Sequence, residues 1–369
     1  MKAWPVLAIV TIQVLLFLAH WFLYRTWIDF WGSFGPSSTL ALQAALFLLA
    51  ISFICAALLG FYSASRLVTV LYRIAAVWLG LLNFLFLAAC LCWPIGFALG
   101  LLGRSADRPL VAAVLFGLAL LAGLYGLLNA RWIRIRRVAV KLAHLPESWR
   151  GRTALVLSDL HLGHVNGQAF SRRIAALAAS LDPDVVFFPG DLFDGSKADA
   201  DALAAPFGDL APPFGIYFST GNHDEFGNAE YYAQVLSQVG IRVLDNEKVT
   251  VDGLDILGVP YGDSTYPMRL RSTLRALRSV PHQASILLNH VPNRLPIVEQ
   301  AGISLQLSGH THGGQIFPFT WFTRRAFGKF TYGLQQFGAL QVYTSSGAGT
   351  WGPPMRVGTH PEIVLLQFE

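Results

Sequence analysis

The sequence predicts an α/β layered domain that follows an all-α membrane domain. Two observations support this fold class. Before residue 131 the chain holds four apolar runs long enough to cross a bilayer. After residue 131, short β-branched runs alternate with helical stretches and Gly, Pro or Asp turns, a pattern typical of sheets that helices cover on both sides.

Composition agrees with this division. At 369 residues the chain can hold one catalytic domain of ordinary size and a second domain. With 54% hydrophobic and 13% charged residues it is too apolar for an ordinary soluble protein, and the apolar excess lies in the first part. We therefore predict a transmembrane domain over residues 1–130, a basic juxtamembrane linker and first strand over residues 131–150, and a catalytic domain over residues 151–369.

The four predicted spans cover residues 4–23, 40–61, 68–92 and 110–128. A cleaved signal peptide is disfavoured because the first run is long and further spans follow it. Buried core helices are the alternative, but a compact soluble domain rarely holds four such runs in succession. Pro94 is expected to end the third span before an apolar stretch over residues 95–102 continues. The three cysteines lie within the spans and predict no disulfide.

The densest basic segment follows the fourth span and contains Arg131, Arg134, Arg136 and Arg137. Such a segment predicts a cytoplasmic location beside anionic headgroups. Most of the net charge of +5 arises in the first part, because residues 131–369 hold 21 Lys and Arg against 20 Asp and Glu. The catalytic part is thus nearly neutral, and nucleic-acid binding is not expected.

In the catalytic part, strands are predicted at residues 154–157, 185–188, 216–219, 241–244, 256–259, 286–288, 305–307, 340–344 and 363–368. Helices are predicted between them at residues 174–181, 231–239 and 270–277. Ligands of such folds gather in the loops at the carboxyl ends of strands. Polar motifs that directly follow strands are therefore candidate site residues.

Five motifs occupy such positions: Ser158-Asp159-Leu160-His161, Gly190-Asp191-Leu192-Phe193-Asp194, Gly221-Asn222-His223-Asp224-Glu225, Asn289-His290, and Gly309-His310-Thr311-His312. Each would be a weak signal alone, but five of the ten histidines fall inside them. Carboxylate, imidazole and amide ligands without cysteine suit Mn²⁺, Fe²⁺ or Zn²⁺ better than a structural zinc knot. The motifs predict a site for two divalent ions and metal-assisted hydrolysis.

Spacing adds one local expectation. Asp159 and His161 are two residues apart, so their side chains would point to the same side of an extended segment and could hold one ion.

The order of these motifs resembles that of the calcineurin-like metallophosphoesterases, from about residue 138 to the C-terminus. The segment Gly309–Gln315 and the tail over residues 344–356 are similar to the membrane-associated bacterial branch, which includes enzymes acting on UDP-2,3-diacylglucosamine. The first 130 residues lie outside the resemblance. It implies a four-layer α/β/β/α sandwich. Arg356 of the tail is a candidate for contact with a phosphate.

The resemblance also implies roles for single residues. Asp191 would bridge two ions, and the full set of metal ligands would be Asp159, His161, Asp191, Asn222, His290, His310 and His312. His312 would turn to the first ion, whereas Asn222, His290 and His310 would hold the second. His223 would act on the leaving-group oxygen, with Asp224 orienting its other ring nitrogen.

These expectations predict a multi-pass phosphohydrolase of the bacterial inner membrane whose catalytic domain faces the cytoplasm. It would cleave a phosphodiester or pyrophosphate bond in a lipid-linked substrate such as UDP-2,3-diacylglucosamine, with a hydroxide that bridges the two ions as the nucleophile. The alternatives are a general phosphodiesterase acting on soluble nucleotides or phosphoproteins, and a non-enzymatic membrane scaffold. Residues 317–330 mix aromatic and basic side chains, which predicts either contact with membrane lipids or a packed lid. The sequence predicts no particular oligomeric state.

Overall fold

A computed structural model describes residues 3–32, 35–277 and 283–369. The chain forms two compact units. The helical unit holds the chain up to Leu128 together with Gly352–Met355, and the α/β unit holds Asn129–Trp351 with Arg356–Glu369.

The helical unit consists of α1 (Ala3–Trp31), α2 (Pro36–Tyr62), α3 (Arg66–Leu101) and α4 (Arg108–Arg131). By length and composition, these four helices of the described chain are able to cross a membrane, as predicted. Polar side chains join α1 to α3: Trp78 Nε1 donates to His20 Nε2 at 2.9 Å, and Trp93 Nε1 donates to Thr26 Oγ1 at 3.0 Å. Such bonds hold apolar helices together where water is excluded.

The expected end of the third span at Pro94 is wrong, because α3 continues through Pro94 to Leu101. Proline removes one backbone donor, but long apolar helices tolerate it where neighbouring groups hold the segment. Here the preceding residue, Trp93, is bonded to Thr26 of α1.

The α/β unit contains two six-stranded sheets. The first has the order β1 (Arg134–Val140), β12 (Glu362–Phe368), β2 (Thr153–Val156), β3 (Val185–Phe188), β4 (Ile216–Phe218) and β5 (Ile241–Val243). The second has the order β10 (Gly333–Phe337), β11 (Leu340–Thr344), β9 (Leu305–Ser308), β8 (Ser285–Leu288), β7 (Leu254–Gly258) and β6 (Glu247–Val251).

Most neighbouring strands are parallel. Strands β2 to β5 run parallel in the first sheet, and β7, β8, β9 and β11 run parallel in the second. The antiparallel pairs are β12 with β2, β6 with β7, and β10 with β11. The loops after β2, β3 and β4 therefore leave the first sheet at one edge, and the loops after β8 and β9 leave the second sheet together.

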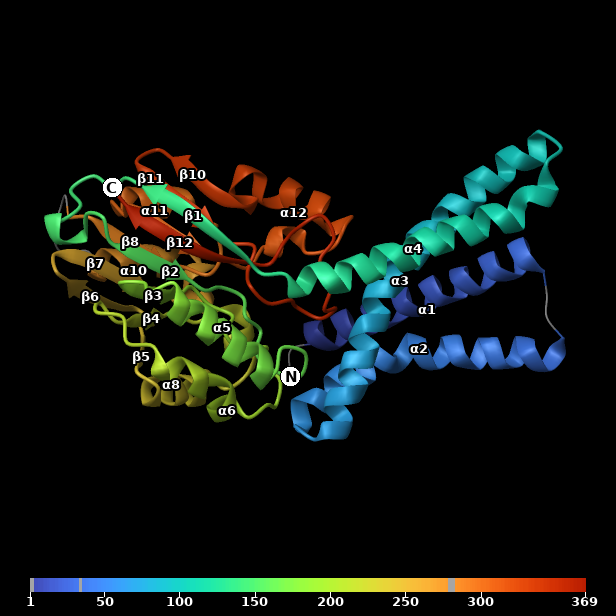
Figure 1. Cartoon of the computed structure of the whole chain (residues 1–369), viewed down its shortest axis with the longest axis horizontal. Coiled ribbons are helices and arrows are strands. Elements are labelled where there is room, and N and C mark those ends of the chain that lie inside the picture. The colour runs from blue at the N-terminus through green and yellow to red at the C-terminus, as the bar shows by residue number, and fades with distance from the viewer. Residues whose placement is uncertain (1–2, 33–34, 278–282) are drawn as a thin grey trace. The chain divides into compact units, whose positions relative to one another are not determined.

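The remaining helices are α5 (Gln168–Ser180), α6 (Ala200–Ala204), α7 (Asn222–Phe226), α8 (Ala229–Gln238), α9 (Tyr261–Ser264), α10 (Pro267–Leu277), α11 (Leu295–Gln300) and α12 (Phe319–Phe327). Figure 1 shows α5, α6 and α8 on one side of the first sheet, and a shared apolar cluster joins these helices to it. A second cluster fills the space between the two sheets, and a third joins the second sheet to α10 and α11. These three clusters confirm the four-layer α/β/β/α architecture.

Two strands and five helices of the α/β unit were not predicted, and four of these helices, α6, α7, α9 and α11, are only four to six residues long. β6 and β10 were not predicted, and α12 lies in the stretch predicted only as an interface segment or a lid. The first strand, β1, begins at Arg134, inside the segment expected to be a basic linker with the first strand. It pairs in parallel with β12 over its whole length, so the basic residues belong to the edge of the first sheet.

Candidate metal centre

The five predicted motifs lie directly after β2, β3, β4, β8 and β9. Their side chains come from both sheets and meet at the carboxyl ends of these strands, the usual ligand position in parallel α/β folds. Nearly all of the predicted ligands are buried, which is uncommon for charged and imidazole groups unless they are paired or bind an ion.

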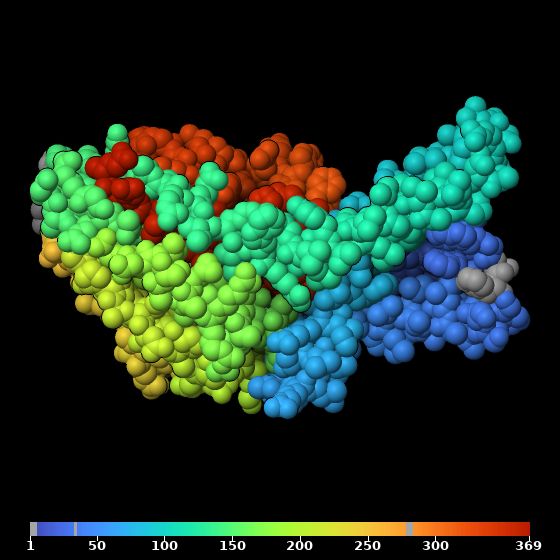
Figure 2. Space-filling model, in the orientation of Figure 1, coloured from blue at the N-terminus to red at the C-terminus, as the bar shows by residue number. Residues whose placement is uncertain are grey.

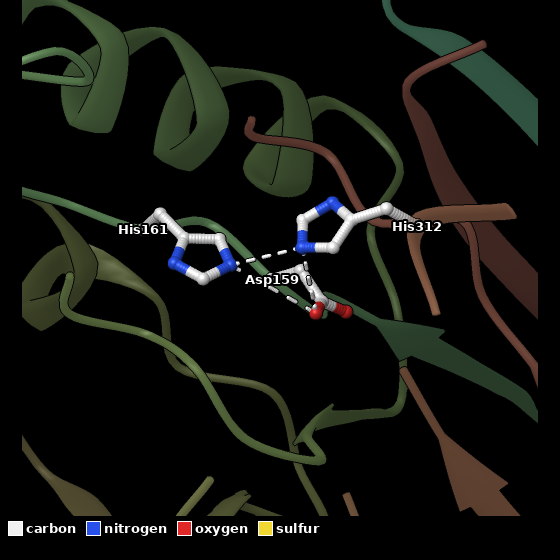
Figure 3. A group of neighbouring side chains, drawn as sticks. All are labelled: Asp159, His161 and His312. Atoms are coloured by element: carbon white, nitrogen blue, oxygen red, sulfur yellow. Dashed lines mark hydrogen bonds and ion pairs between the residues drawn. The ribbon is translucent and has the colours of Figure 1, made fainter. Parts of the chain in front are cut away.

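Asp159, His161 and His312 form the first group (Figure 3). His312 Nε2 lies 3.3 Å from Asp159 Oδ1 and 3.0 Å from His161 Nε2. His161 Nε2 lies 4.0 Å from the same carboxylate oxygen. The two imidazoles and the carboxylate thus point at one small volume, as ligands of a single ion do.

Asp191 joins this group to a second one. Its Oδ2 lies 3.7 Å from His161 Nε2 and 3.1 Å from His290 Nε2. Its other oxygen, Oδ1, accepts the backbone N–H of His223 at 2.8 Å. One carboxylate between two imidazoles has the geometry that a bridging ligand needs.

Asn222 and His310 lie beside the second group. The amide oxygen of Asn222 is 2.9 Å from His310 Nδ1, and the ring of His310 lies 5.2 Å from that of His290. His310 is not among the described His, Asp and Glu side chains whose ligand atoms cluster within 4.8 Å of one another. His310 therefore lies beside these clustered ligand atoms and is not one of them.

Five predicted ligands have a backbone in the left-handed region. The φ angles are 52° for Asp159, 46° for His161, 53° for Asp191, 68° for His310 and 48° for His312. The expectation of an extended segment from Asp159 to His161 is therefore wrong, although the two side chains do converge. Non-glycine residues adopt this region at a cost, and such residues concentrate at functional sites.

Burial sets the protonation of the histidines. Burial lowers the pKa of His161 and of His312 well below the ordinary value, and it lowers that of His310 to about 4. Burial opposes protonation of His290 too, but the Asp191 carboxylate raises its pKa to about 9. Although burial favours its neutral form, Asp191 has a lowered pKa because His290 and His161 stabilise its charge. Three of the imidazoles are thus neutral, the form that binds metals.

The donor set fits a divalent ion. His161 Nε2 and His290 Nε2, on two buried side chains, lie 3.7 Å and 3.1 Å from Asp191 Oδ2. His161 Nε2 and His312 Nε2 face each other at 3.0 Å, so two neutral rings present nitrogen atoms to the same point. A cation there would satisfy these nitrogens together with the carboxylates, and no cysteine takes part.

The expected role of Asp224 is wrong. Its carboxylate does not contact the ring of His223 but accepts backbone N–H groups of Asp191 at 2.8 Å, Phe193 at 2.9 Å and Gly221 at 2.9 Å. Burial and the charge of Asp191 raise the pKa of Asp224 to about 8, and the backbone donors oppose that shift. Asp224 therefore positions the two loops that carry Asp191 and Asn222.

His223 is held by Asp194 instead. Nδ1 of His223 lies 3.1 Å from the backbone carbonyl oxygen of Asp194, so a ring that donates there has Nε2 available for another group. The carboxylate of Asp194 accepts the hydroxyl and the backbone N–H of Ser196, which fixes the loop. One atom of His223 lies within 4.8 Å of ligand atoms of His161 and Asp191, so the ring borders the predicted metal ligands.

Arg356, named above only as a candidate for contact with a phosphate, has a fully buried side chain that is used within the protein. Its guanidinium donates to the carbonyl oxygens of Gly349 at 2.6 Å, Ser346 at 2.7 Å and His312 at 3.2 Å. This role was not predictable from the sequence, because the tail motif shows the residue but not its burial. Arg356 holds the C-terminal loop against the loop that carries His312.

Comparisons with known proteins identify the family of the chain. Residues 152–314 match the family model described as calcineurin-like phosphoesterase. The chain is 33% identical over 313 residues to a transmembrane protein with a metallophosphoesterase domain from Danio rerio, covering 79% of this chain and 71% of that protein. It is 31% identical over 243 residues to an uncharacterized metallophosphoesterase from Campylobacter jejuni, covering 64% of this chain and 63% of that protein.

Similarity to solved structures is lower. A 5′-nucleotidase precursor from Thermus thermophilus has a TM-score of 0.33 at 13% identity, covering 58% of this chain and 54% of that one. The relatives by sequence come from animals as well as bacteria, so they do not single out a bacterial branch. Four helices able to cross a membrane and the transmembrane relatives indicate a membrane protein. The chain belongs to the calcineurin-like phosphoesterase family and is a metal-dependent phosphoesterase.

Proposed function

We propose that this chain is a membrane-anchored phosphohydrolase that uses two divalent ions to cleave a phosphodiester or pyrophosphate bond. The observation that carries the proposal is the position of the Asp191 carboxylate, whose Oδ2 lies 3.1 Å from His290 Nε2 and 3.7 Å from His161 Nε2. A carboxylate between two imidazole groups can bind two cations while offsetting part of their charge.

In this proposal one ion is held by Asp159, His161, Asp191 and His312, and the other by Asp191, Asn222, His290 and His310. The Nε2 atoms of His161 and His290, which face the Asp191 carboxylate, support one ligand in each set. Mn²⁺, Fe²⁺ and Zn²⁺ suit such nitrogen and oxygen ligands. When bound, two such ions supply Lewis acidity toward phosphate oxygens and lower the pKa of bound water.

Side chains of the protein would donate a proton to the leaving group and position the metal ligands. The carbonyl of Asp194 orients the His223 ring through Nδ1, which leaves Nε2 to protonate the leaving-group oxygen. Asp224 keeps the loops of Asp191 and Asn222 together through three backbone hydrogen bonds. Arg356 keeps the His312 loop in place. Together these residues fix the ligands before substrate arrives, which lowers the entropy cost of reaction.

We further propose that the substrate is lipid-linked and that the α/β unit faces the cytoplasm of a bacterial inner membrane. Four apolar helices in the same chain as a hydrolase unit support a lipid-linked substrate, because anchoring raises the effective concentration of substrates in the same bilayer. The basic residues at the start of β1 support the cytoplasmic side. A UDP-linked diacylated sugar such as UDP-2,3-diacylglucosamine is the candidate to test.

The experiment is a hydrolysis assay of the full chain in detergent with Mn²⁺. It compares UDP-2,3-diacylglucosamine with bis-p-nitrophenyl phosphate, before and after a chelator. We expect chelator-sensitive hydrolysis of both and a large preference for the acylated substrate. Equal rates would favour the general phosphodiesterase, and a rate that survives complete metal removal would overturn the proposed metal mechanism.

A further inference from the structure

Helix α12 presents its aromatic side chains outward. Phe319, Trp321 and Phe322 are 55%, 62% and 54% exposed. Its partly buried positions are Thr320, Thr323 and Phe327, so two of the three side chains that α12 turns toward the protein are threonines. In Figure 2 the orange segment that contains α12 forms part of the surface of the viewed face. Three exposed aromatic side chains on one short helix form an apolar surface suited to contact with another molecule or with a membrane.

Two glycines fix this orientation. A Cβ atom at Gly314 would lie 2.4 Å from the Cα of Thr320, and one at Gly358 would lie 3.2 Å from the Thr320 methyl group. Both glycines also have left-handed φ angles, of 85° and 88°. Their lack of side chains lets the threonine side of α12 approach the α/β unit closely, which keeps the aromatic side outward.

The charge of this region is uniformly positive. Residues 317–330 include Arg324, Arg325 and Lys329 and contain no Asp or Glu. Both arginine side chains are exposed, and neither guanidinium has a hydrogen-bond or ion-pair partner within the part of the chain that the structure describes. Lys329 Nζ donates to the backbone carbonyl of Gln336 at 2.8 Å, which leaves it able to donate two further bonds.

A pocket of about 680 Å³ adjoins the helix. Arg324 and Lys329 line it, and no acidic residue is among its described lining residues. The hydroxyl groups of the lining residues Tyr332, Ser346 and Thr359 already donate to acceptors of the protein, so the two cations are the groups left for a ligand. Two cationic side chains in a pocket without a carboxylate lining suit a phosphate group. Trp321 also lines the pocket, so the pocket adjoins the exposed aromatic side chains of α12.

We propose that α12 and this pocket bind an anionic phospholipid. The headgroup phosphate occupies the pocket between Arg324 and Lys329, and Phe319, Trp321 and Phe322 lie in the bilayer interface. Exposed Trp and Phe with adjacent cations are the composition of segments that bind anionic membrane surfaces. The α/β unit is tethered close to a bilayer by the chain itself. Helix α4 is able to cross a membrane, and β1 begins at Arg134, three residues after α4 ends.

Binding of a lipid there would act close to the metal centre. The ring of Phe327, at the end of α12, lies 6.2 Å from that of His310. The pocket also includes Gly313, which follows the predicted ligand His312. The proposed lipid site does not depend on hydrolysis, so it can be tested by a binding measurement without an activity assay.

The experiment places an environment-sensitive fluorophore on a Phe322→Cys variant of the full chain, after Cys55, Cys90 and Cys92 are replaced by alanine. The chain is reconstituted in nanodiscs of phosphatidylcholine alone or mixed with phosphatidylglycerol. A label on Glu247→Cys is the control, since β6 lies at the opposite edge of the second sheet from β10. We expect a blue shift and quenching by a bilayer-soluble quencher at position 322 in phosphatidylglycerol only, and neither at position 247.

Charge variants test the headgroup. Because each cation near an anionic surface contributes on the order of 1 kcal/mol, Arg324→Gln with Lys329→Gln should raise the phosphatidylglycerol content needed for half of the shift by on the order of tenfold. The matched change of exposed arginines on α10, Arg271→Gln with Arg275→Gln, should leave it unaltered.

Two results would overturn the proposal. An equal signal in both lipids would show that binding does not require an anionic headgroup. Loss of the signal on adding inorganic phosphate would show that free phosphate occupies the pocket. Either result leaves the proposed phosphohydrolase untouched, because no step of this experiment measures hydrolysis.

Discussion

His223 borders the predicted metal ligands, but its ring is fixed by a backbone carbonyl of Asp194. We predict that His223→Ala keeps its metals and loses on the order of 10²–10⁴ in kcat, because a general acid is removed and no ligand is lost. The loss should be smaller for nitrophenyl esters, whose leaving groups need no proton. Metal content and rates with nitrophenyl and alkyl esters are the measurements, and an equal loss for both would contradict the general-acid role.

Asp224 is predicted to behave differently from His223, because it binds three backbone N–H groups and not the imidazole. In Asp224→Asn, an NH₂ group replaces one of the two carboxylate oxygens that accept these backbone N–H groups, so at least one N–H loses its acceptor. We expect this change to lower the free energy of unfolding by roughly 1–3 kcal/mol and to weaken metal binding. The rate loss should persist in a His223→Ala background, since the two residues act separately. Thermal unfolding and a double-mutant cycle check this. Complete loss of the Asp224 effect in that background would instead restore the orienting role.

The loop after β9 depends on a glycine at position 309. A Cβ atom there would lie 2.0 Å from both Asp159 Oδ2 and Ser158 Oγ, so the loops after β9 and β2 pack against each other with no spare room. We predict that Gly309→Ala weakens metal binding on the order of 10–100-fold by displacing Asp159. Gly208→Ala is the control, because a Cβ atom there would make only an ordinary contact of 3.5 Å with Val239. Metal titration distinguishes the two, and similar affinities would show that the loops can separate.

The parts of the fold that were predictable are those with a local pattern. The buried strand β3 is apolar throughout, and its limits agree with the prediction at residues 185–188. β6 (Glu247–Val251) is an edge strand with mixed polarity, and only its pairing with β7 defines it. β10 likewise depends on β11. α12 was missed because its exposed aromatics do not mark a face packed on a core.

In the candidate site, too, local sequence patterns were predictable and contacts between distant residues were not. Its members were recognisable from the motifs, whereas their partners were not. Asp224 contacts backbone groups of Asp191 and Phe193, some thirty residues away along the chain, and Arg356 contacts His312 across 44 residues. Such contacts depend on how strands from two sheets meet, so side-chain identity and spacing do not encode them.

The whole molecule has a predicted orientation. The basic segment from Arg131 to Arg137 should keep both termini in the cytoplasm, with the loops near Arg25 and Arg104 outside. Fusion of the C-terminus to alkaline phosphatase should be inactive, and fusion to a fluorescent protein should be bright. An active phosphatase fusion would place the α/β unit outside and exclude cytoplasmic nucleotide-linked lipids as substrates.

The central claim is that Asp191 joins two ions into one hydrolytic site. The most direct test is the metal content of the purified full chain and of Asp191→Asn, measured together with hydrolysis of bis-p-nitrophenyl phosphate. We predict two bound ions and turnover in the unaltered chain, and loss of both ions and of turnover in the variant, with an unchanged circular dichroism spectrum. A variant that retains two ions and full activity would contradict the account.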